Sequence, residues 1–103
     1  MEISFREKKL RKICEDKQML QKRFGECAVK ISQRLGEFLS AESLHDIKML
    51  PGPRLHPLQG NYSGYFALDV KQPYRIIFKP LNGDLNDLKT ITTIEIFKIE
   101  DYH

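Results

Sequence analysis

The chain has 103 residues, of which 41% are hydrophobic and 30% are charged, and its formal net charge is +3. This composition argues against a disordered chain, and the length predicts one domain, residues 1–103, with a two-layer core. No apolar run approaches the roughly 20 residues of a membrane span, and the first residues lack the plan of a signal peptide. We therefore expect a cytoplasmic protein that does not associate with membranes.

The positive charge is concentrated in the first half of the chain. Residues 1–53 carry eleven Lys and Arg against eight Asp and Glu, whereas residues 54–103 carry six of each. The densest run is Arg6, Lys8, Lys9, Arg11 and Lys12. A solvated helix face explains such a run, and the alternative is a surface for an acidic partner or for nucleic acid.

Sequence motifs for metals, cofactors and disulfides are absent. The chain has two cysteines, Cys14 and Cys27, at a spacing that does not resemble a metal site, and no Gly-rich phosphate loop. Because both cysteines fall in helix-like stretches, we interpret them as reduced residues that pack in the core. We expect neither a metal nor a cofactor.

The first half of the chain predicts a short strand followed by helices. Ile3 and Phe5 alternate with polar neighbours, which favours a strand, and a helix begins near Arg6. This helix either ends near Asp16, which could cap a new one, or continues to Phe24. A second helix follows Gly25, and then a further helical turn at 40–46. The second helix has an apolar face of Ala28, Ile31, Leu35, Phe38 and Leu39, and a polar face of Lys30, Gln33, Arg34 and Glu37.

The hydrophobic period changes after Pro51-Gly52-Pro53, which ends helical structure. Residues 54–58 are expected to be extended, and residues 65–70 and 74–79 to form antiparallel strands. The last strand, about 92–99, carries Ile94 and Ile96 and then Phe97 and Ile99. That switch of parity predicts either a β-bulge or a strand covered on both faces.

Helices first and consecutive strands afterwards predict an α+β domain, with the N-terminal helices packed on one face of a small, mostly antiparallel β-sheet. The opposite face of this sheet would be free. On that face we expect Arg75 and Lys71, beside the end of the last strand and the segment that contains His56.

Four segments in the second half carry a family resemblance. They are Arg54-Leu55-His56-Pro57-Leu58-Gln59-Gly60-Asn61, Gly64-Tyr65-Phe66, Pro73-Tyr74-Arg75-Ile76-Ile77-Phe78 and Glu100-Asp101-Tyr102-His103. In this order they resemble the HigB branch of the RelE/ParE toxin superfamily of type II toxin–antitoxin systems. The resemblance implies a RelE/ParE-like fold, and a ribosome-dependent endoribonuclease that cuts translated mRNA without a metal. Gln59 departs from the lysine of many relatives, which would remove one phosphate contact.

The resemblance also implies the site. The catalytic candidates are His56, Asp101, Tyr102 and His103, and the candidates for binding RNA phosphate are Arg75, Lys71 and Arg54. Metal-free RNA cleavage needs a base for the 2′-hydroxyl, an acid for the departing 5′-oxygen and positive charge for the phosphorane. Histidine suits the proton transfers because its unperturbed pKa is about 6.5, and arginine suits the phosphate because its planar fork donates to two oxygens.

Two other functions fit the same fold. One is a non-enzymatic, ParE-like toxin that binds DNA gyrase, although this chain keeps the histidine, aspartate and tyrosine residues that such a toxin would not need. The other is a non-toxic binding protein that acts with its antitoxin at operator DNA. The partners that the resemblance implies are a HigA-like helix-turn-helix antitoxin, the ribosome and mRNA, with operator DNA reached only through the antitoxin.

Overall fold

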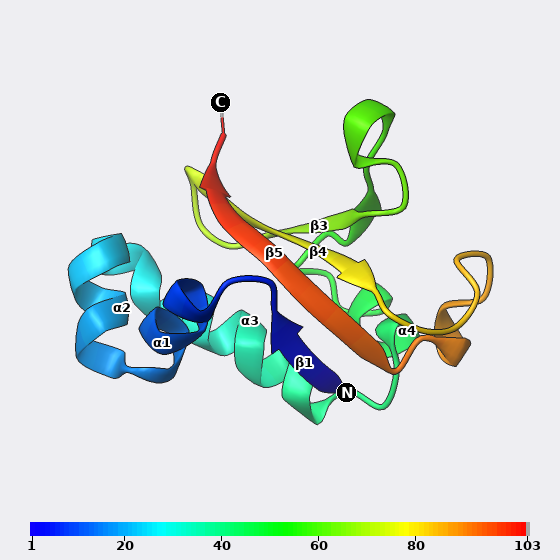
Figure 1. Cartoon of the computed structure of the whole chain (residues 1–103), viewed down its shortest axis with the longest axis horizontal. Coiled ribbons are helices and arrows are strands. Elements are labelled where there is room, and N and C mark those ends of the chain that lie inside the picture. The colour runs from blue at the N-terminus through cyan, green and yellow to red at the C-terminus, as the bar shows by residue number, and fades with distance from the viewer. Residues whose placement is uncertain (103) are drawn as a thin grey trace.

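The computed structural model describes residues 1–102, and it confirms the predicted α+β fold (Figure 1). The strands are β1 (Glu2–Phe5), β2 (His56–Pro57), β3 (Phe66–Asp69), β4 (Tyr74–Pro80) and β5 (Thr93–Asp101). The helices are α1 (Lys8–Glu15), α2 (Lys17–Phe24), α3 (Ala28–Ser40) and α4 (Leu44–Lys48). Three short 3-10 turns complete the description: η1 (Gly25–Cys27), η2 (Gly60–Tyr62) and η3 (Leu88–Thr90).

The five strands form one sheet in the order β1-β5-β4-β3-β2. The strands β2 to β5 pair in antiparallel fashion, and β1 runs parallel to β5. As Figure 1 shows, the helices lie on one side of this sheet, while η2 and the end of β5 rise on the other side. We call the side without helices the open face. Among residues 1–102, no helix combines the length and the apolar character that crossing a membrane requires.

The two alternatives for the first helix are decided at Asp16, where the helix breaks. Its carboxylate accepts hydrogen bonds from the backbone N–H groups of Gln18 and Met19, at 2.9 and 3.1 Å. Asp16 therefore caps α2, and it turns the chain so that both short helices bury an apolar edge. Both cysteines, Cys14 in α1 and Cys27 in η1, are free thiols in the described structure.

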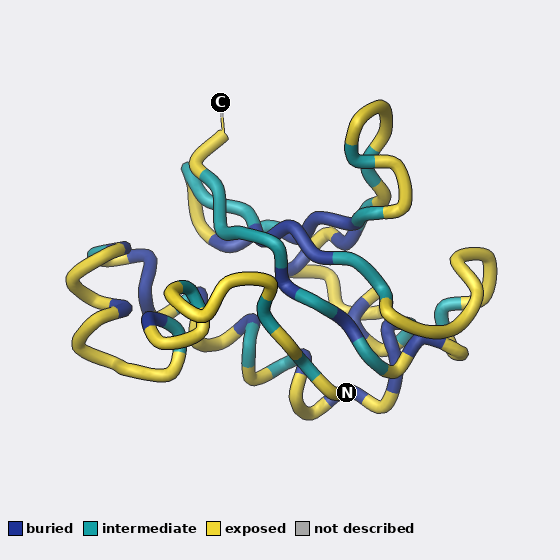
Figure 2. Tube along the Cα trace, viewed as in Figure 1, coloured by how far each residue is buried: buried dark blue, intermediate teal, exposed yellow. Residues whose placement is uncertain are grey.

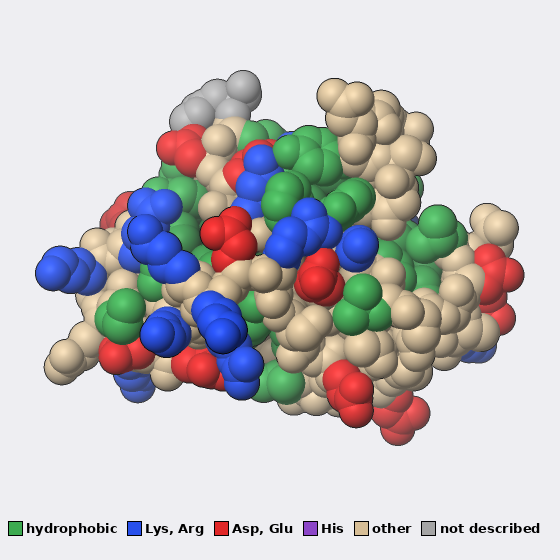
Figure 3. All heavy atoms as spheres, in the orientation of Figure 1, with side chains coloured by type: hydrophobic (Ala, Val, Ile, Leu, Met, Phe, Trp, Pro, Cys, Tyr) green, Lys and Arg blue, Asp and Glu red, His purple; other side chains and the backbone are tan. Residues whose placement is uncertain are grey.

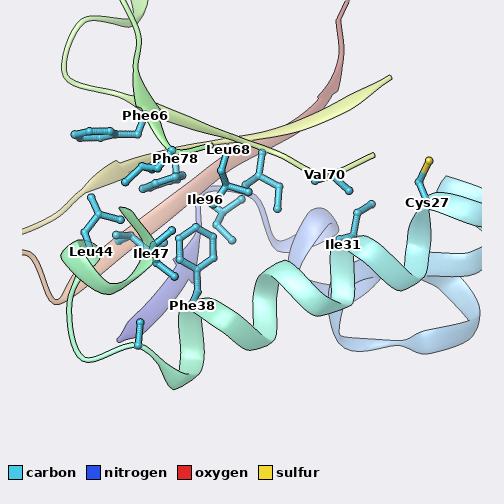
Figure 4. Packing of buried hydrophobic residues seen from close by; sticks show 14 of the residues in the cluster. Cys27, Ile31, Phe38, Leu44, Ile47, Phe66, Leu68, Val70, Phe78 and Ile96 are labelled. Carbon is cyan, nitrogen blue, oxygen red and sulfur yellow. The ribbon is translucent and has the colours of Figure 1, made fainter. Parts of the chain in front are cut away.

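The core lies between α3 and the covered side of the sheet, as the burial of the trace in Figure 2 shows. Figure 4 shows Ile31 and Phe38 of α3 pointing toward the strands. Phe38 meets Phe78 of β4 edge-to-face, with ring centroids 5.0 Å apart. Phe38, Phe78 and Ile31 are completely buried, so the predicted apolar stripe of the second helix packs on the sheet, except for Leu39, which is 64% exposed near the end of α3.

The polar face predicted for α3 is wrong at one residue, Arg34. This side chain is only 5% exposed. Its Nε donates a hydrogen bond to the carbonyl oxygen of Asp69 at 2.8 Å, and one of its terminal nitrogens lies 2.9 Å from the Glu37 carboxylate. A helix pattern predicts exposure from spacing alone, and it cannot detect that a long side chain reaches a carbonyl of a neighbouring strand.

The parity switch in the last strand is a β-bulge. Ile77 pairs with Lys98 whereas the next residue of β4, Phe78, pairs with Ile96. Phe97 is therefore an extra residue of β5 with no partner opposite it. As a result, the side chains of Phe97 and Lys98 both lie on the open face, although they are consecutive in the chain.

Candidate active site

The candidate site lies on the open face, and the strand register defines which residues share it. His56, Ala67, Ile77 and Lys98 form one row across four strands, and Asp69, Arg75 and Glu100 form the next row. Figure 3 shows basic and hydrophobic side chains together in a hollow between the end of β5 and the turn at 60–62. This hollow is open to solvent.

Asp69 is the residue at which the middle of the chain and its end meet. Its carboxylate receives two hydrogen bonds from the Arg54 guanidinium, at 2.7 and 3.2 Å. The Tyr102 hydroxyl lies 3.4 Å from the same carboxylate. The hydrogen bond with Asp69 raises the pKa of Arg54, so this guanidinium stays charged. Arg54, His56, Asp69 and Tyr102 are called the Asp69 cluster below.

His56 belongs to this cluster through the backbone of Arg54. Its Nδ1 lies 2.8 Å from the carbonyl oxygen of Arg54. A carbonyl can only accept, so Nδ1 must carry the hydrogen, and in the neutral ring Nε2 is left with its lone pair. Arg54 itself has a positive φ of 50°, which turns its carbonyl under the imidazole. The arrangement prepares Nε2 of His56 to accept a proton.

Arg75 extends the site toward β5. It forms an ion pair with Glu100 at 2.6 Å, and its guanidinium lies 4.4 Å from the centre of the Tyr102 ring. Lys98 contacts the other oxygen of Glu100 at 3.1 Å. Burial tends to raise the pKa of Glu100, but the hydrogen bonds from Arg75 and Lys98 outweigh it and lower that pKa. Glu100 is therefore a carboxylate that holds two cations on the open face.

Three aromatic rings lie next to this network, and we call Tyr62, Tyr65 and Phe97 the aromatic cluster. Their ring centroids are 5.8 to 6.2 Å apart. The guanidinium of Arg6 lies 4.2 Å from the centre of Phe97 and donates to the Tyr65 hydroxyl at 2.7 Å. Lys98 lies 5.3 to 5.4 Å from the rings of Phe97 and Tyr62. All three rings are half-buried, so each keeps an accessible surface.

The remaining predicted residues are not gathered at Asp69. Asp101 pairs with Tyr74 and, because side chains alternate along a strand, it is directed to the side opposite Glu100 and Tyr102. Lys71 lies in the turn between β3 and β4, and its ammonium is 3.9 Å from Glu26 of η1 rather than on the open face. His103 lies outside the described residues.

Sequence reasoning missed Asp69, Glu100 and Phe97. An aspartate in an alternating strand usually faces solvent. Nothing in the sequence indicates that an arginine 15 residues earlier will donate hydrogen bonds to its carboxylate. Phe97 had a signal, because the parity switch there allowed a bulge as one of two interpretations.

Among the described residues, cavities also lie apart from the Asp69 cluster. One of about 650 Å³ lies between α2 and α3 and is lined by Leu20 and Val29. Another, of about 350 Å³, is lined by Leu55 and Leu85. A cavity of about 250 Å³ lies between α1 and β5 and is described below. Within residues 1–102, no group of three or more His, Cys, Asp or Glu side chains is placed to hold a metal ion.

Solved structures of bacterial toxins share this fold. YafQ from Escherichia coli strain BL21(DE3) superposes with a TM-score of 0.62 at 16% identity, covering 97% of this chain and 91% of YafQ. A YoeB/ParE toxin from Agrobacterium tumefaciens superposes with a TM-score of 0.61 at 13% identity, over the whole of both chains. At these identities the likeness defines the fold alone, which is that of the RelE-like toxins.

Sequence comparison assigns the family. Residues 3–90 match the sequence model of the HigB-like toxin family, which is described as the RelE-like toxin of the type II toxin-antitoxin system HigB. The chain belongs to this family. It is 26% identical to toxin HigB-1 of Vibrio cholerae over 81% of this chain and 87% of that toxin. It is 38% identical to endoribonuclease HigB of Proteus vulgaris over 50 residues, which span 48% of this chain and only 45% of that protein.

Proposed function

We propose that this protein is a ribosome-dependent endoribonuclease toxin that cuts translated mRNA. The observation that carries the proposal is the meeting of two segments at Asp69, where Arg54 and Tyr102 contact one carboxylate and His56 rests on the Arg54 carbonyl. Family membership and the endoribonuclease name of the Proteus vulgaris relative support it.

The proposed reaction is attack of a ribose 2′-hydroxyl on its own 3′-phosphate. Nε2 of His56 takes the hydroxyl proton, the O2′–phosphorus bond forms and the phosphorus–O5′ bond breaks, leaving a 2′,3′-cyclic phosphate. The end of the chain supplies the acid that protonates the departing O5′, and its candidates are Tyr102 and His103, because Asp101 is directed away from the open face. No step requires a bound metal.

Two arginines provide the positive charge of this mechanism. Arg75 and Arg54 lie on the open face and are held by Glu100 and Asp69, respectively. Arg54 remains 62% exposed, so a phosphate can approach it without displacing Asp69. Donors fixed in advance stabilise the developing phosphorane charge without reorganising at the moment of reaction. Tyr102 is 37% exposed above Arg75 and can stack on a nucleotide.

The test is expression of the chain alone in cells, followed by mapping of mRNA 5′ ends. We expect new ends within translated regions, and loss of these ends with His56→Ala. His45→Ala is the matched control, because His45 lies on α4 and has no part in the Asp69 cluster. Growth arrest with DNA damage but no new RNA ends would replace the proposal with gyrase poisoning.

Membership of the family implies an antitoxin partner. We propose a HigA-like helix-turn-helix antitoxin that also carries the contacts to operator DNA, with the ribosome and its mRNA as the target. Co-purification of this chain with the product of a neighbouring helix-turn-helix reading frame, and loss of mRNA cleavage in that complex, tests the proposal.

A further inference from the structure

We infer that the aromatic cluster and the cavity beside it form a second nucleotide-binding site, which stacks an unpaired RNA base next to the Asp69 cluster. The inference deepens the proposed function and rests on it. Its first basis is the bulge of β5. A regular strand would place Phe97 and Lys98 on opposite faces, whereas the extra residue places an aromatic ring and a cation side by side on the open face.

The second basis is the chemistry of the cluster itself. Its three rings come from η2, the residue before β3 and the bulge, and they are only partly buried, unlike the rings of the core. Two cations, Arg6 and Lys98, lie against the rings at cation–π distances. Base stacking on aromatic rings combined with nearby cations is the usual means of holding single-stranded nucleic acid without reading its sequence.

The third basis is the cavity of about 250 Å³ between α1 and β5, at the place where β1 has ended and the chain turns into α1. We call it the basic cavity. Its lining includes three cations, Lys9, Arg23 and Lys98, against one carboxylate, Glu7. Phe97 belongs to both the aromatic cluster and this cavity, and Lys98, which also lines the cavity, lies against two rings of the cluster. A nucleotide with its base on the rings therefore has a basic hollow beside it for its phosphate.

The same surface is continuous with the proposed cleavage site. Glu100 contacts Lys98 on one side and Arg75 on the other, and Arg75 lies under Tyr102. The two aromatic positions, Phe97 and Tyr102, are thus joined by one ion-pair network. We assign the aromatic cluster to a base that neighbours the cleaved nucleotide on the same strand.

The test is binding of a fluorescently labelled single-stranded RNA of eight nucleotides to the full chain, measured by anisotropy in the His56→Ala background so that no cleavage occurs. Phe97→Leu and Tyr62→Leu keep apolar volume and remove the stacking ring. We expect each to weaken binding about fivefold or more, in line with the contribution of a single stacked base. Phe97→Trp should retain the affinity, and thermal unfolding of each variant verifies its fold.

The salt dependence of the same binding separates the cavity from the rings. Loss of one phosphate contact lowers the slope of log affinity against log salt by about 0.7 for a single strand. We expect this change for Arg23→Gln and Lys9→Gln, and no change of slope for Phe97→Leu. Lys22→Gln is the matched control, because Lys22 lines the larger cavity between α2 and α3 and should leave both affinity and slope unchanged.

Unaltered affinity in both Phe97→Leu and Tyr62→Leu would overturn the stacking site, as would a parent chain that does not bind the RNA. These outcomes are distinct from failure of the proposed function, which is measured separately as mRNA ends in cells. A protein that cuts translated mRNA but binds equally well without Phe97 loses only the second site. A protein that cuts no mRNA but binds RNA through Phe97 loses the nuclease proposal.

Discussion

Arg34 and Asp69 connect the helical layer to the open face of the sheet. Nε of Arg34 donates to the backbone carbonyl of Asp69 at 2.8 Å, from the covered side, while the Asp69 carboxylate holds Arg54 on the open side. The backbone N–H of Asp69 donates a hydrogen bond to the carbonyl oxygen of Pro53 at 2.7 Å. The residue at the centre of the candidate site is therefore fixed by a buried arginine that never reaches the substrate side.

Arg34→Met keeps most of the volume of this side chain and removes its hydrogen bonds. We expect the free energy of unfolding to fall by about 2 kcal/mol, because the Asp69 carbonyl and the Glu37 carboxylate lose a charged donor in a buried position. Chemical denaturation measures this loss. Arg11→Met, at an exposed residue of α1, is the control and should change stability by less than about 0.5 kcal/mol. Equal stabilities would contradict a structural role for Arg34.

Asp69→Asn should separate stability from activity. Arg54 is largely exposed to solvent, so loss of the Arg54–Asp69 pair should change stability little. Cleavage of mRNA should fall at least about tenfold, because both Arg54 and Tyr102 lose the charge that orients them. If Asp69→Asn cuts mRNA as well as the unchanged chain, Asp69 does not position the site.

Glu100→Gln should show its effect on stability only above acidic pH. The folded-state pKa of Glu100 lies below its ordinary value of 4.5, so the ionised carboxylate stabilises the fold above that pH. The stabilisation is lost as the pH falls through the folded-state pKa. We expect Glu100→Gln to cost about 1 kcal/mol at pH 7, and a cost that shrinks steadily as the pH is lowered below 4.5, by denaturant unfolding across that range. If the stability lost in Glu100→Gln does not vary with pH, the ionised carboxylate does not stabilise the fold.

Two glycines make a matched pair for stability. Gly83 has a φ of +79°, and a Cβ there would lie 2.5 Å from the carbonyl oxygen of Thr90, so Gly83→Ala should cost more than about 2 kcal/mol. Gly36 lies inside α3 with open space around it, so Gly36→Ala should stabilise the protein by about 0.5–1 kcal/mol. Thermal unfolding of both variants tests the pair, and a stable Gly83→Ala would mean that this loop can rearrange.

A chain that stops after Asp101 should remain folded and should not cut mRNA. The tail that the structure describes contributes the Tyr102 ring above Arg75, the Tyr102 hydroxyl contact with Asp69, and a backbone hydrogen bond from the N–H of Tyr102 to the carbonyl oxygen of Pro73 at 3.0 Å. These contacts lie outside the core. Circular dichroism and mapping of mRNA ends test the two halves of this prediction. Unfolding of the shortened chain would show that the tail contributes to the core.

The sequence predicted the α+β architecture and the antiparallel pairing of residues 65–70 with 74–79, because both depend on the period of apolar residues. The parity switch in the last strand allowed either a bulge or a strand covered on both faces, and the structure has the bulge at Phe97. It also predicted that the middle segment approaches the end of the chain. It could not predict Asp69 or Arg34, because their partners are set by three-dimensional placement. Lys71 was expected on the open face but contacts Glu26, since the turn after β3 points its side chain toward the helices. The roles of Asp101 and His103 stay predictions.

The position of β5 in the sheet has a consequence for synthesis of the protein. This strand pairs with both β1 and β4, yet it is synthesised after every other described element. Glu2 can pair with Thr93 only after the 91 residues that follow Glu2 have been synthesised. Contacts so distant in sequence form only when both segments are available. The sheet, with Glu100 and Tyr102, is therefore incomplete while residues 93–102 are still inside the ribosome. Until those residues have emerged, neither the Arg75–Glu100 ion pair nor the contact of Tyr102 with Asp69 can form.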